Sequence, residues 1–505
     1  MGVFNKLFTE EKSLYKVIQQ IQHHEEQQHL ITGLTGGARP AFYHALYAET
    51  KKPVYIVVPN LLQAQKLVDD LVALAGESNV FYYPADDFIA ADMSIASPEL
   101  RAQRIATMRH LVNGENGLYV ISAAGMRKVV TPRERFRGAM LSTAVGQDIE
   151  LDDWIQQLIF MGYHRNGMVT APGEFALRGG ILDIYPPYAE SPIRVELFDT
   201  EVDSIRTFDA DSQRSIDRLE KLEVLPASEL LLTLEEKVQI AGRLEEALAK
   251  SLKKVKQPEV QELLVENVQH DIAMLKMGDV PDHILKYGSL LFDSQASLSD
   301  YFMHDSLVLF DELGRIQEVM DTWEREEQEW FISLIEEGKM LHDVKLSYTF
   351  KEILANVKQP KVFFALFART FANMRFTKTT SISCKPMQQF HGQIALLQNE
   401  VERWGYEKYT VIFAAKEADR VQAINSLMAE YQIEAKVGMP TGPGVYIVDA
   451  PISAGFELPM QKIAVVTDDE LFKQQAKRKS RPQKMTNAER IKSYTEIKPG
   501  DYVVH

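Results

Sequence analysis

The hydrophobic pattern of the N-terminal part restricts the fold more than any other feature. Between residues 29 and 122, short apolar runs alternate with segments of helical spacing, which is typical of a parallel sheet built from strand–helix–strand units. The expected strands are His29–Leu34, Pro53–Val58 and Leu118–Ser122. Helices are expected at Ala41–Thr50 and after Asn60, a capping residue, as far as Gly76. Residues 1–126 should therefore form an α/β part.

The period of the pattern then changes to two, which indicates antiparallel strands. Phe175 and Leu177 should point to one side of a strand, and Ala176 and Arg178 to the other, which leaves Arg178 free to meet an acidic partner. A turn at residues 199–200 should join two alternating strands into a hairpin. These strands are Ile193–Phe198 and Val202–Phe208. We expect a small antiparallel α+β domain at residues 127–216.

Helical spacing is expected again from about Leu219, through Leu234–Leu275, and a buried strand follows at Leu307–Phe310. These features predict a second α/β part at residues 217–375. A further small α/β domain is expected at residues 376–470. Its strands should be Tyr409–Ala414, Val445–Val448 and Ile463–Thr467, and its helix Ala415–Tyr431. The predicted fold class is multidomain α/β, with the antiparallel domain inserted between two α/β parts.

Composition excludes several classes of protein. At roughly 150 residues per domain, 505 residues suggest about three domains. A single cysteine, Cys384, excludes a disulfide framework, and the net charge of −15 argues against coating nucleic acid through overall charge. The apolar run Val362–Ala368 is far shorter than the roughly 20 residues that cross a bilayer. We expect a cytoplasmic protein without a membrane segment, and no metal, since the His residues show no ligand spacing.

A glycine-rich segment stands where a phosphate-binding loop would be expected, after a strand and before a helix. It reads Gly33-Leu34-Thr35-Gly36-Gly37-Ala38-Arg39-Pro40. The positions that normally hold a glycine, the phosphate-binding Lys and the Mg²⁺-binding Ser or Thr are here Ala38, Arg39 and Pro40. The loop is therefore expected to be degenerate and kept for packing, with residual nucleotide binding as the alternative.

The run Leu307–Phe310 ends in Asp311 and Glu312, a pair that in nucleotide hydrolases positions Mg²⁺ and the attacking water. Acidic residues that leave a buried strand are also common as solvated starts of loops. Because the chain lacks a competent phosphate loop, we expect Asp311 and Glu312 to be solvated residues at the start of a loop. The pair would then be a degenerate Walker B motif.

Residues 471–496 are rich in Lys and Arg and poor in apolar residues, which is typical of an exposed basic linker. Lys477, Arg478, Lys479 and Arg481 form its densest part. A flexible tether is expected, because no aromatic residues are interleaved with the charges, and contact with DNA phosphates is the alternative.

Three stretches carry a resemblance to a known family. They are Gly33–Phe42, Met161–Pro186 and Ile193–Asp209. They resemble the N-terminal part of the bacterial transcription-repair coupling factor. Residues 1 to about 470 are similar to the UvrB-like module of this family, with its two RecA-like parts, and to the small domain that follows it. Residues 497–505 look like the start of an RNA-polymerase-interacting domain that is truncated here.

The resemblance implies a binding module rather than an enzyme. The antiparallel domain would dock UvrA of nucleotide excision repair and so recruit it to stalled RNA polymerase. Two contact arginines of UvrB match Arg165 and Arg178, and a third is Ala176 here. The long hairpin with which UvrB probes damaged DNA has no room between Phe81–Phe88 and Ser94–Glu99.

In the family, an ATP- and Mg²⁺-dependent translocase of helicase superfamily 2 follows, and it acts on double-stranded DNA. Without it, the resemblance implies a chain that uses no cofactor and does not hydrolyse ATP by itself. One alternative is a divergent UvrB-like ATPase that uses Arg39 with Asp311 and Glu312. Another is a nonspecific DNA-binding protein that uses residues 473–492.

Overall fold

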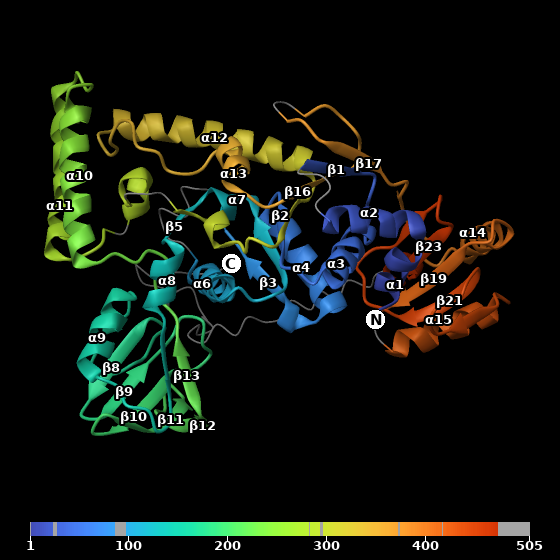
Figure 1. The fold of residues 1–505 in the computed structure, drawn as a ribbon, viewed down its shortest axis with the longest axis horizontal. Helices are drawn as coiled ribbons and strands as arrows, with labels where there is room; N and C mark the ends of the chain where they lie inside the picture. The colour runs from blue at the N-terminus through green and yellow to red at the C-terminus, as the bar shows by residue number, and fades with distance from the viewer. Residues whose placement is uncertain are drawn as a thin grey trace, which may run out of the picture.

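The fold was determined as a computed structural model, which describes residues 2–23, 28–85, 97–281, 283–292, 296–371, 374–416 and 418–472. A central α/β unit carries three projections (Figure 1). An antiparallel domain extends to one side, a pair of long helices stands at one end, and a second, smaller α/β unit lies at the other end. The expected multidomain α/β class is confirmed.

The central unit is built on one seven-stranded parallel sheet, in the order β17-β1-β16-β15-β2-β4-β3. Its strands are β1 Gln28–Thr32, β2 Val54–Val58, β3 Val80–Tyr83, β4 Leu118–Ser122, β15 Leu307–Phe310, β16 Lys361–Ala365 and β17 Lys378–Ser381. The two α/β parts expected at 1–126 and 217–375 thus share a single sheet, because β15 inserts between β16 and β2. Such long-range pairing leaves no local signal in the sequence.

Helices cover both faces of this sheet, and the strands supply a core to each. Alternate residues of β2 point to opposite faces: Tyr55 and Val57 belong to one apolar core, Val54 and Ile56 to the other. The helices are α1 Val3–Glu10, α2 Lys12–Gln22, α3 Ala38–Thr50, α4 Leu61–Ala75, α6 Pro98–Asn113, α7 Ala123–Arg127, α12 Leu313–Glu336 and α13 Phe350–Asn356. The Asn60 side chain accepts from the backbone N–H of Gln63, which confirms the expected cap of α4.

The antiparallel domain has a six-stranded sheet in the order β12-β11-β10-β9-β8-β7. Its strands are β7 His164–Arg165, β8 Glu174–Arg178, β9 Ile181–Ile184, β10 Ile193–Phe198, β11 Glu201–Phe208 and β12 Ser215–Leu219. The expected hairpin is confirmed, with Asp199 at φ 61° in its turn. One face of the sheet is apolar and packs with α9, Leu151–Phe160, through Trp154 and Leu158.

The expectation of helical structure from Leu219 is wrong. Lys221–Val224 is strand β13, which pairs with β6, Leu141–Ala144. Its side chains alternate between exposed and buried, which is the period of a strand. Strand β12 also runs across the domain boundary expected at residue 216, and β17 lies beyond the boundary expected at residue 375 although it belongs to the central sheet.

Two short elements and two long helices connect these parts. Strand β5, Val129–Val130, pairs with β14, Ala296–Ser297, and helix α8, Arg133–Ala139, leads into the antiparallel domain. The helical pattern at 234–275 forms two helices, α10 Leu234–Leu252 and α11 Pro258–Met277, which pack against each other around their own core. Thr233 and Glu236 cap α10 reciprocally. The turns η1 Glu77–Asn79, η2 Ile284–Leu290 and η3 Leu298–Tyr301 complete this part of the chain.

The smaller α/β unit has a mixed sheet in the order β18-β22-β23-β19-β21-β20. Its elements are β18 Lys385–Pro386, α14 Ile394–Tyr406, β19 Thr410–Ala415, α15 Ala418–Glu430, β20 Ala435–Val437, β21 Gly444–Asp449, β22 Phe456–Leu458, β23 Ile463–Thr467 and α16 Asp468–Leu471. The strands expected here are confirmed. The unit shares a core with the central one, where Phe456 lies 6.5 Å from Phe4 between ring centroids. Within the described ranges, no helix has the length and apolar character needed to cross a bilayer.

Candidate functional site

The glycine-rich loop lies between β1 and α3, where the sequence placed it, but the protein's own backbone covers it. The backbone N–H of Gly37 donates to the carbonyl oxygen of Ala454, in the smaller α/β unit, at 3.2 Å. A Cβ at Gly37 would lie 2.2 Å from that oxygen and 2.7 Å from the Ile452 side chain. A Cβ at Gly33 would lie 2.0 Å from the carbonyl oxygen of Ile382. These glycines therefore permit close approach of protein backbone.

The first turn of α3 brings Arg39 to the two carboxylates expected as a degenerate Walker B pair. The guanidinium donates to Asp311 Oδ1 and to Glu312 Oε1, both at 2.8 Å. Burial alone would lower the pKa of Arg39, but Asp311 and Glu312 outweigh that effect and raise this pKa above its ordinary value. Pro40 lies in the first turn of the helix, where backbone N–H groups have no partner within the helix, so its lack of an N–H costs no hydrogen bond.

The expectation that Asp311 and Glu312 are solvated loop starts is wrong. Their side chains are only 13% and 25% exposed, and both are paired with Arg39. Burial of a carboxylate requires such a partner, and the partner comes from a residue 272 positions away in the chain. Ala38 is fully buried in the same region. Arg39, Asp311 and Glu312 thus form an internal ion-pair network.

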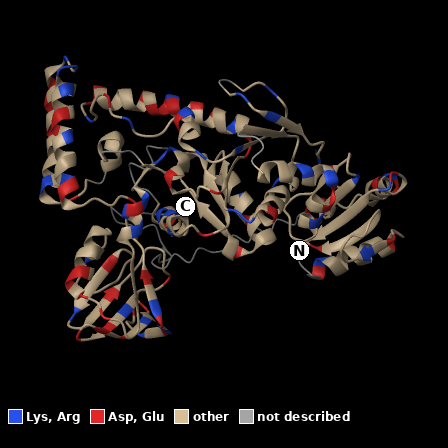
Figure 2. Cartoon of the chain, in the orientation of Figure 1, with Lys and Arg blue, Asp and Glu red and all other residues tan. Residues whose placement is uncertain are grey.

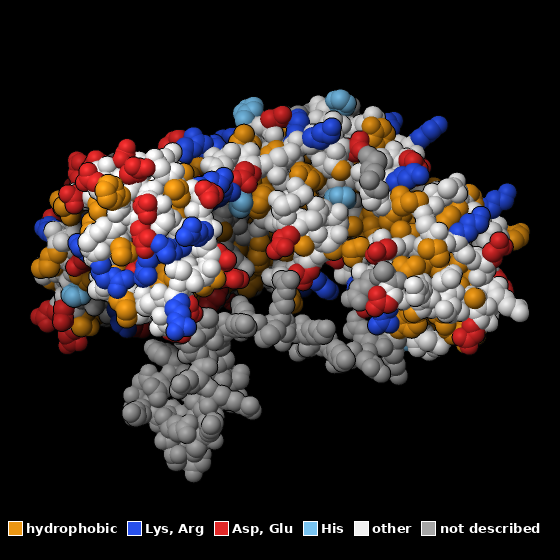
Figure 3. Space-filling model, turned by 90° about the horizontal axis from the view of Figure 1, so that it is seen from below, with side chains coloured by type: hydrophobic (Ala, Val, Ile, Leu, Met, Phe, Trp, Pro, Cys, Tyr) orange, Lys and Arg blue, Asp and Glu red, His pale blue; other side chains and the backbone are white. Residues whose placement is uncertain are grey.

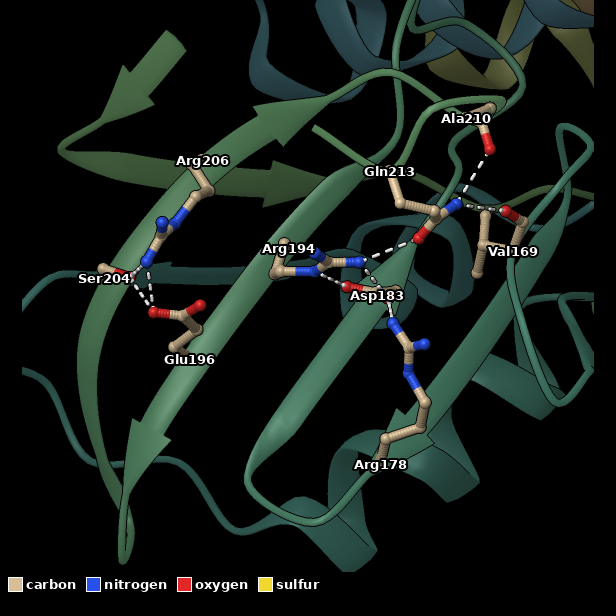
Figure 4. A network of polar contacts seen from close by, with 9 residues as sticks. All are labelled: Val169, Arg178, Asp183, Arg194, Glu196, Ser204, Arg206, Ala210 and Gln213. Atoms are coloured by element: carbon tan, nitrogen blue, oxygen red, sulfur yellow. Dashed lines mark hydrogen bonds and ion pairs between the residues drawn. The ribbon is translucent and has the colours of Figure 1, made fainter. Parts of the chain in front are cut away.

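A second polar network lies on the outer face of the antiparallel sheet (Figure 4). Asp183, on β9, is 1% exposed and accepts from Arg178 at 2.7 Å and from Arg194 at 2.7 and 2.9 Å. Gln213 accepts from Arg194 at 3.0 Å. The expectation of a free Arg178 is thus wrong, because Asp183 holds it. Its side chain is still 45% exposed, so one end of the guanidinium faces solvent.

The neighbouring strands extend this face. Arg206 pairs with Glu196 and also donates to Ser204. Arg194 lies over the ring of Phe208, 4.3 Å from its centroid, which is a cation–π contact. The outer face therefore presents three guanidiniums in fixed orientations. We call Arg178, Arg194 and Arg206 the arginine face.

Arg165 stands apart from this face, at the edge of the same sheet. It is exposed and has no carboxylate partner among the described residues. Its strand pairs with β8 so that Arg165 lies beside Phe175, which points to the side opposite Arg178. Ala176 is 1% exposed, in a small apolar cluster with Phe208. The place expected for a third contact is therefore covered, and Ala176 is a packing residue of the sheet.

A buried ion pair contributes to holding the antiparallel domain on the central unit. Arg104, on α6, is fully buried and donates through Nε and Nη2 to both oxygens of Glu229, at 2.6 and 2.7 Å. Burial alone would raise the pKa of Glu229, but the Arg104 guanidinium outweighs this and lowers the pKa to about 2. This bidentate pair therefore links α6 of the central unit to the segment that leaves the antiparallel domain.

The antiparallel domain matches a known family, and the whole chain matches larger proteins. The family is described as the UvrB interaction domain, and its match covers residues 141–230. The transcription-repair-coupling factor of Bacillus subtilis strain 168 is 42% identical over 503 residues, which are 99% of this chain. Those of Staphylococcus epidermidis strain RP62A and Staphylococcus aureus strain MRSA252 are 33% and 32% identical, each over 94% of it.

The chain belongs to the transcription-repair coupling factor family. This confirms the resemblance found in the sequence. The chain spans less than half of these curated relatives, namely 43% of the Bacillus subtilis protein and 41% of each staphylococcal one. The match to the UvrB interaction domain coincides with the domain that carries the arginine face.

Two features of the coupling-factor chain were missed in the sequence, although a signal for each existed. Arg194 and Asp183 occupy outward positions of alternating strands, as Arg178 does, so the period of two could have found them. Three expectations lie outside the described residues. They are the expected basic linker with Lys477, Arg478, Lys479 and Arg481, the resemblance of residues 497–505 to the start of a further domain, and the expectation that residues 86–96 leave no room for a long hairpin.

Proposed function

We propose that the antiparallel domain docks UvrA and thereby links transcription to nucleotide excision repair. The observation that carries this proposal is the arginine face, held by a buried carboxylate, within the residues that match the UvrB interaction domain. A guanidinium that is already oriented loses little side-chain entropy when it binds a carboxylate of a partner. Arg165, at the sheet edge, would supply a further contact.

The contact must be local, because the domain as a whole is acidic. Residues 141–230 contain seven Lys or Arg and seventeen Asp or Glu. Seen from the side to which this domain projects, the surface mixes acidic, basic and hydrophobic side chains (Figure 3). The net negative charge of the domain would not attract an acidic partner from a distance. We therefore expect the affinity to depend on bidentate contacts of individual arginines and to vary only modestly with salt.

We also propose that this chain neither needs a cofactor nor hydrolyses ATP. The closed glycine loop and the pairing of Arg39 with Asp311 support this view. Binding of ATP with Mg²⁺, of RNA polymerase and of double-stranded DNA by the family would then depend on parts beyond these 505 residues. We place the protein in the cytoplasm, where these partners occur.

Capture of purified UvrA by the immobilised chain tests the docking proposal. We expect Arg165→Glu combined with Arg178→Glu to reduce capture at least tenfold. Arg165→Glu alone is the cleaner variant, because this side chain makes no ion pair in the described structure that its loss could disturb. Lys221→Glu, at an exposed position of β13 outside the six-stranded sheet, changes the charge of the domain as much as Arg165→Glu and should leave capture intact. Capture that is unaffected by the first pair would contradict the proposal.

A further inference from the structure

One segment of this acidic chain has no acidic residue at all. Between Glu352 and Glu400 there is no Asp or Glu, whereas six Lys or Arg occur. They are Lys358, Lys361, Arg369, Arg375, Lys378 and Lys385. Because the whole chain carries 71 acidic and 56 basic residues, a stretch of this length with one sign of charge is a local departure from the average.

The centre of this stretch lies between β16 and β17, where the structure describes residues 366–371 and 374–377, and aromatic packing holds Phe371 and Phe376 on the central sheet. The Phe376 ring lies 5.5 Å from that of Phe363 on β16, and Phe371 lies 5.7 Å from Phe376. The backbone N–H of Thr377 donates to the carbonyl oxygen of Gln28. We call the described residues 366–371 and 374–378 the basic loop. These contacts anchor the inward side of the basic loop to the central sheet.

The basic loop presents cations and an exposed aromatic ring to solvent. Phe367 is 73% exposed, and Leu366 beside it is 47% exposed. Arg369 and Arg375 are exposed, and neither they nor Lys378 has a carboxylate partner in the part of the chain that the structure describes. Figure 2 shows Lys and Arg, but no Asp or Glu, along this loop beside β17.

Arg369 is held in place although it pairs with no acid. Its guanidinium lies against Gly314 at the start of α12, where a Cβ would come within 1.8 Å of Nη2. It also stacks 5.0 Å above the centroid of the Phe371 ring. By contrast, Lys358 and Lys361 lie at the other end of β16 and donate to the backbone carbonyls of Ala355 and Val357.

Two simpler explanations cover only part of this pattern. A Lys at a sheet edge discourages pairing with other chains, and β17 is an edge strand, so this accounts for Lys378. It does not account for Arg369 or Arg375, which lie outside the strand. A protein partner would require a larger apolar centre than Leu366 and Phe367 supply. Cations that lie along the loop without carboxylate partners, beside an exposed aromatic ring, suit a phosphate backbone and an unpaired base.

We propose that the basic loop binds single-stranded nucleic acid. Arg369, Arg375 and Lys378 contact successive phosphates, and Phe367 stacks on a base. Sequence preference should be weak, because stacking and phosphate contacts are common to all bases. This proposal does not depend on UvrA docking, which takes place on another domain.

Fluorescence anisotropy of the full chain with labelled oligo(dT) of about 20 nucleotides, at about 50 mM salt, tests the proposal, with a duplex of equal length for comparison. Arg375→Glu with Lys378→Glu should weaken oligo(dT) binding at least tenfold and should reduce the slope of log affinity against log salt by about 1.4. Phe367→Ala should weaken oligo(dT) binding about tenfold, without changing that slope, and should leave duplex binding unchanged.

A matched control separates the loop from overall charge. Lys253→Glu with Lys436→Glu changes the net charge by the same amount at two exposed positions elsewhere and should leave binding as it was. Circular dichroism checks that each variant is folded. Unchanged oligo(dT) binding in both loop variants would overturn the proposal, as would an absence of binding by the unaltered chain. Displacement of oligo(dT) by poly-glutamate, as effective as by oligo(dT) itself, would overturn nucleic acid as the ligand.

Discussion

Arg39 and Asp311 are 272 positions apart in the sequence, and a 2.8 Å ion pair joins them at the carboxyl edge of the central sheet. Glu312 shares the same guanidinium. In a nucleotide hydrolase the corresponding carboxylates would face a metal ion and its water. Here Arg39 neutralises both carboxylates, so that the ion pairs connect α3 to the end of strand β15 instead of binding a ligand.

This link should matter for stability. Arg39→Ala leaves two largely buried carboxylates without a counter-charge, and we expect it to lower the free energy of unfolding by about 2 kcal/mol, less than a fully buried pair would lose. Arg315→Ala is the matched control, because Arg315 is 55% exposed and lies 3.5 Å from Glu312. Its effect should stay below about 0.5 kcal/mol. Urea unfolding of the two variants measures the difference, and equal effects would contradict the interpretation.

The same geometry predicts how the chain responds to nucleotide. We expect the melting temperature to be the same with and without ATP and Mg²⁺, because a ligand at about 100 times its dissociation constant would stabilise the fold by roughly 2.7 kcal/mol. Arg39→Lys with Pro40→Ser restores the two missing side chains of a phosphate loop. It should still show no shift, since the N–H of Gly37 is bonded to Ala454. A rise in melting temperature with ATP would support the ATPase alternative.

The close approach of Ala454 makes Gly37 sensitive to any side chain. Gly37→Val would place its Cβ 2.2 Å from a backbone oxygen, so the two α/β units must separate locally, at a cost of about 3 kcal/mol. The φ of Gly37 is −67°, so the effect comes from the contact and not from backbone strain. Gly138→Ala, in helix α8 with nothing within 4 Å, should be neutral or slightly stabilising. Thermal unfolding compares them, and equal stability of the two would refute the contact argument.

Asp183 tests whether the arginine face depends on its buried carboxylate. Asp183→Asn keeps the shape but removes the charge that holds Arg178 and Arg194, so we expect a loss of about 2 kcal/mol in stability and weaker UvrA capture. Asp203→Asn, an exposed position of the same domain, changes the charge equally and should alter neither. If Asp183→Asn lowers stability but leaves capture intact, the network is structural only.

The individual helices and strands could be predicted from the sequence better than the contacts between elements that lie far apart in the chain. The bounds of strand β4 and the cap of α4 followed from local patterns, since hydrophobic period and capping are properties of neighbouring residues. The pairing of β15 with β2 and the ion pair of Arg39 did not, because both join residues more than 200 positions apart. The same holds for the candidate site. The alternating pattern of the sequence predicted Arg178, but its ion pair with Asp183 depends on the pairing of β8 with β9, which the sequence did not reveal.

Glu229 gives the chain a defined response to acid. Its folded pKa of about 2 lies below the ordinary value of 4.5, so its contribution to stability is fully present above pH 4.5 and is lost as the pH falls towards 2. A shift of this size corresponds to about 3 kcal/mol. Glu229→Gln should therefore destabilise the chain at pH 7 and should show a smaller loss between pH 4.5 and 2 than the unaltered protein. Glu223→Gln, at a 40% exposed carboxylate paired with Arg109, should change stability by less than about 1 kcal/mol and keep the full pH dependence. Thermal unfolding at pH 7 and pH 3 distinguishes these cases, and an equal loss on acidification in the Glu229→Gln variant and the unaltered protein would show that the Arg104 pair does not set the acid response.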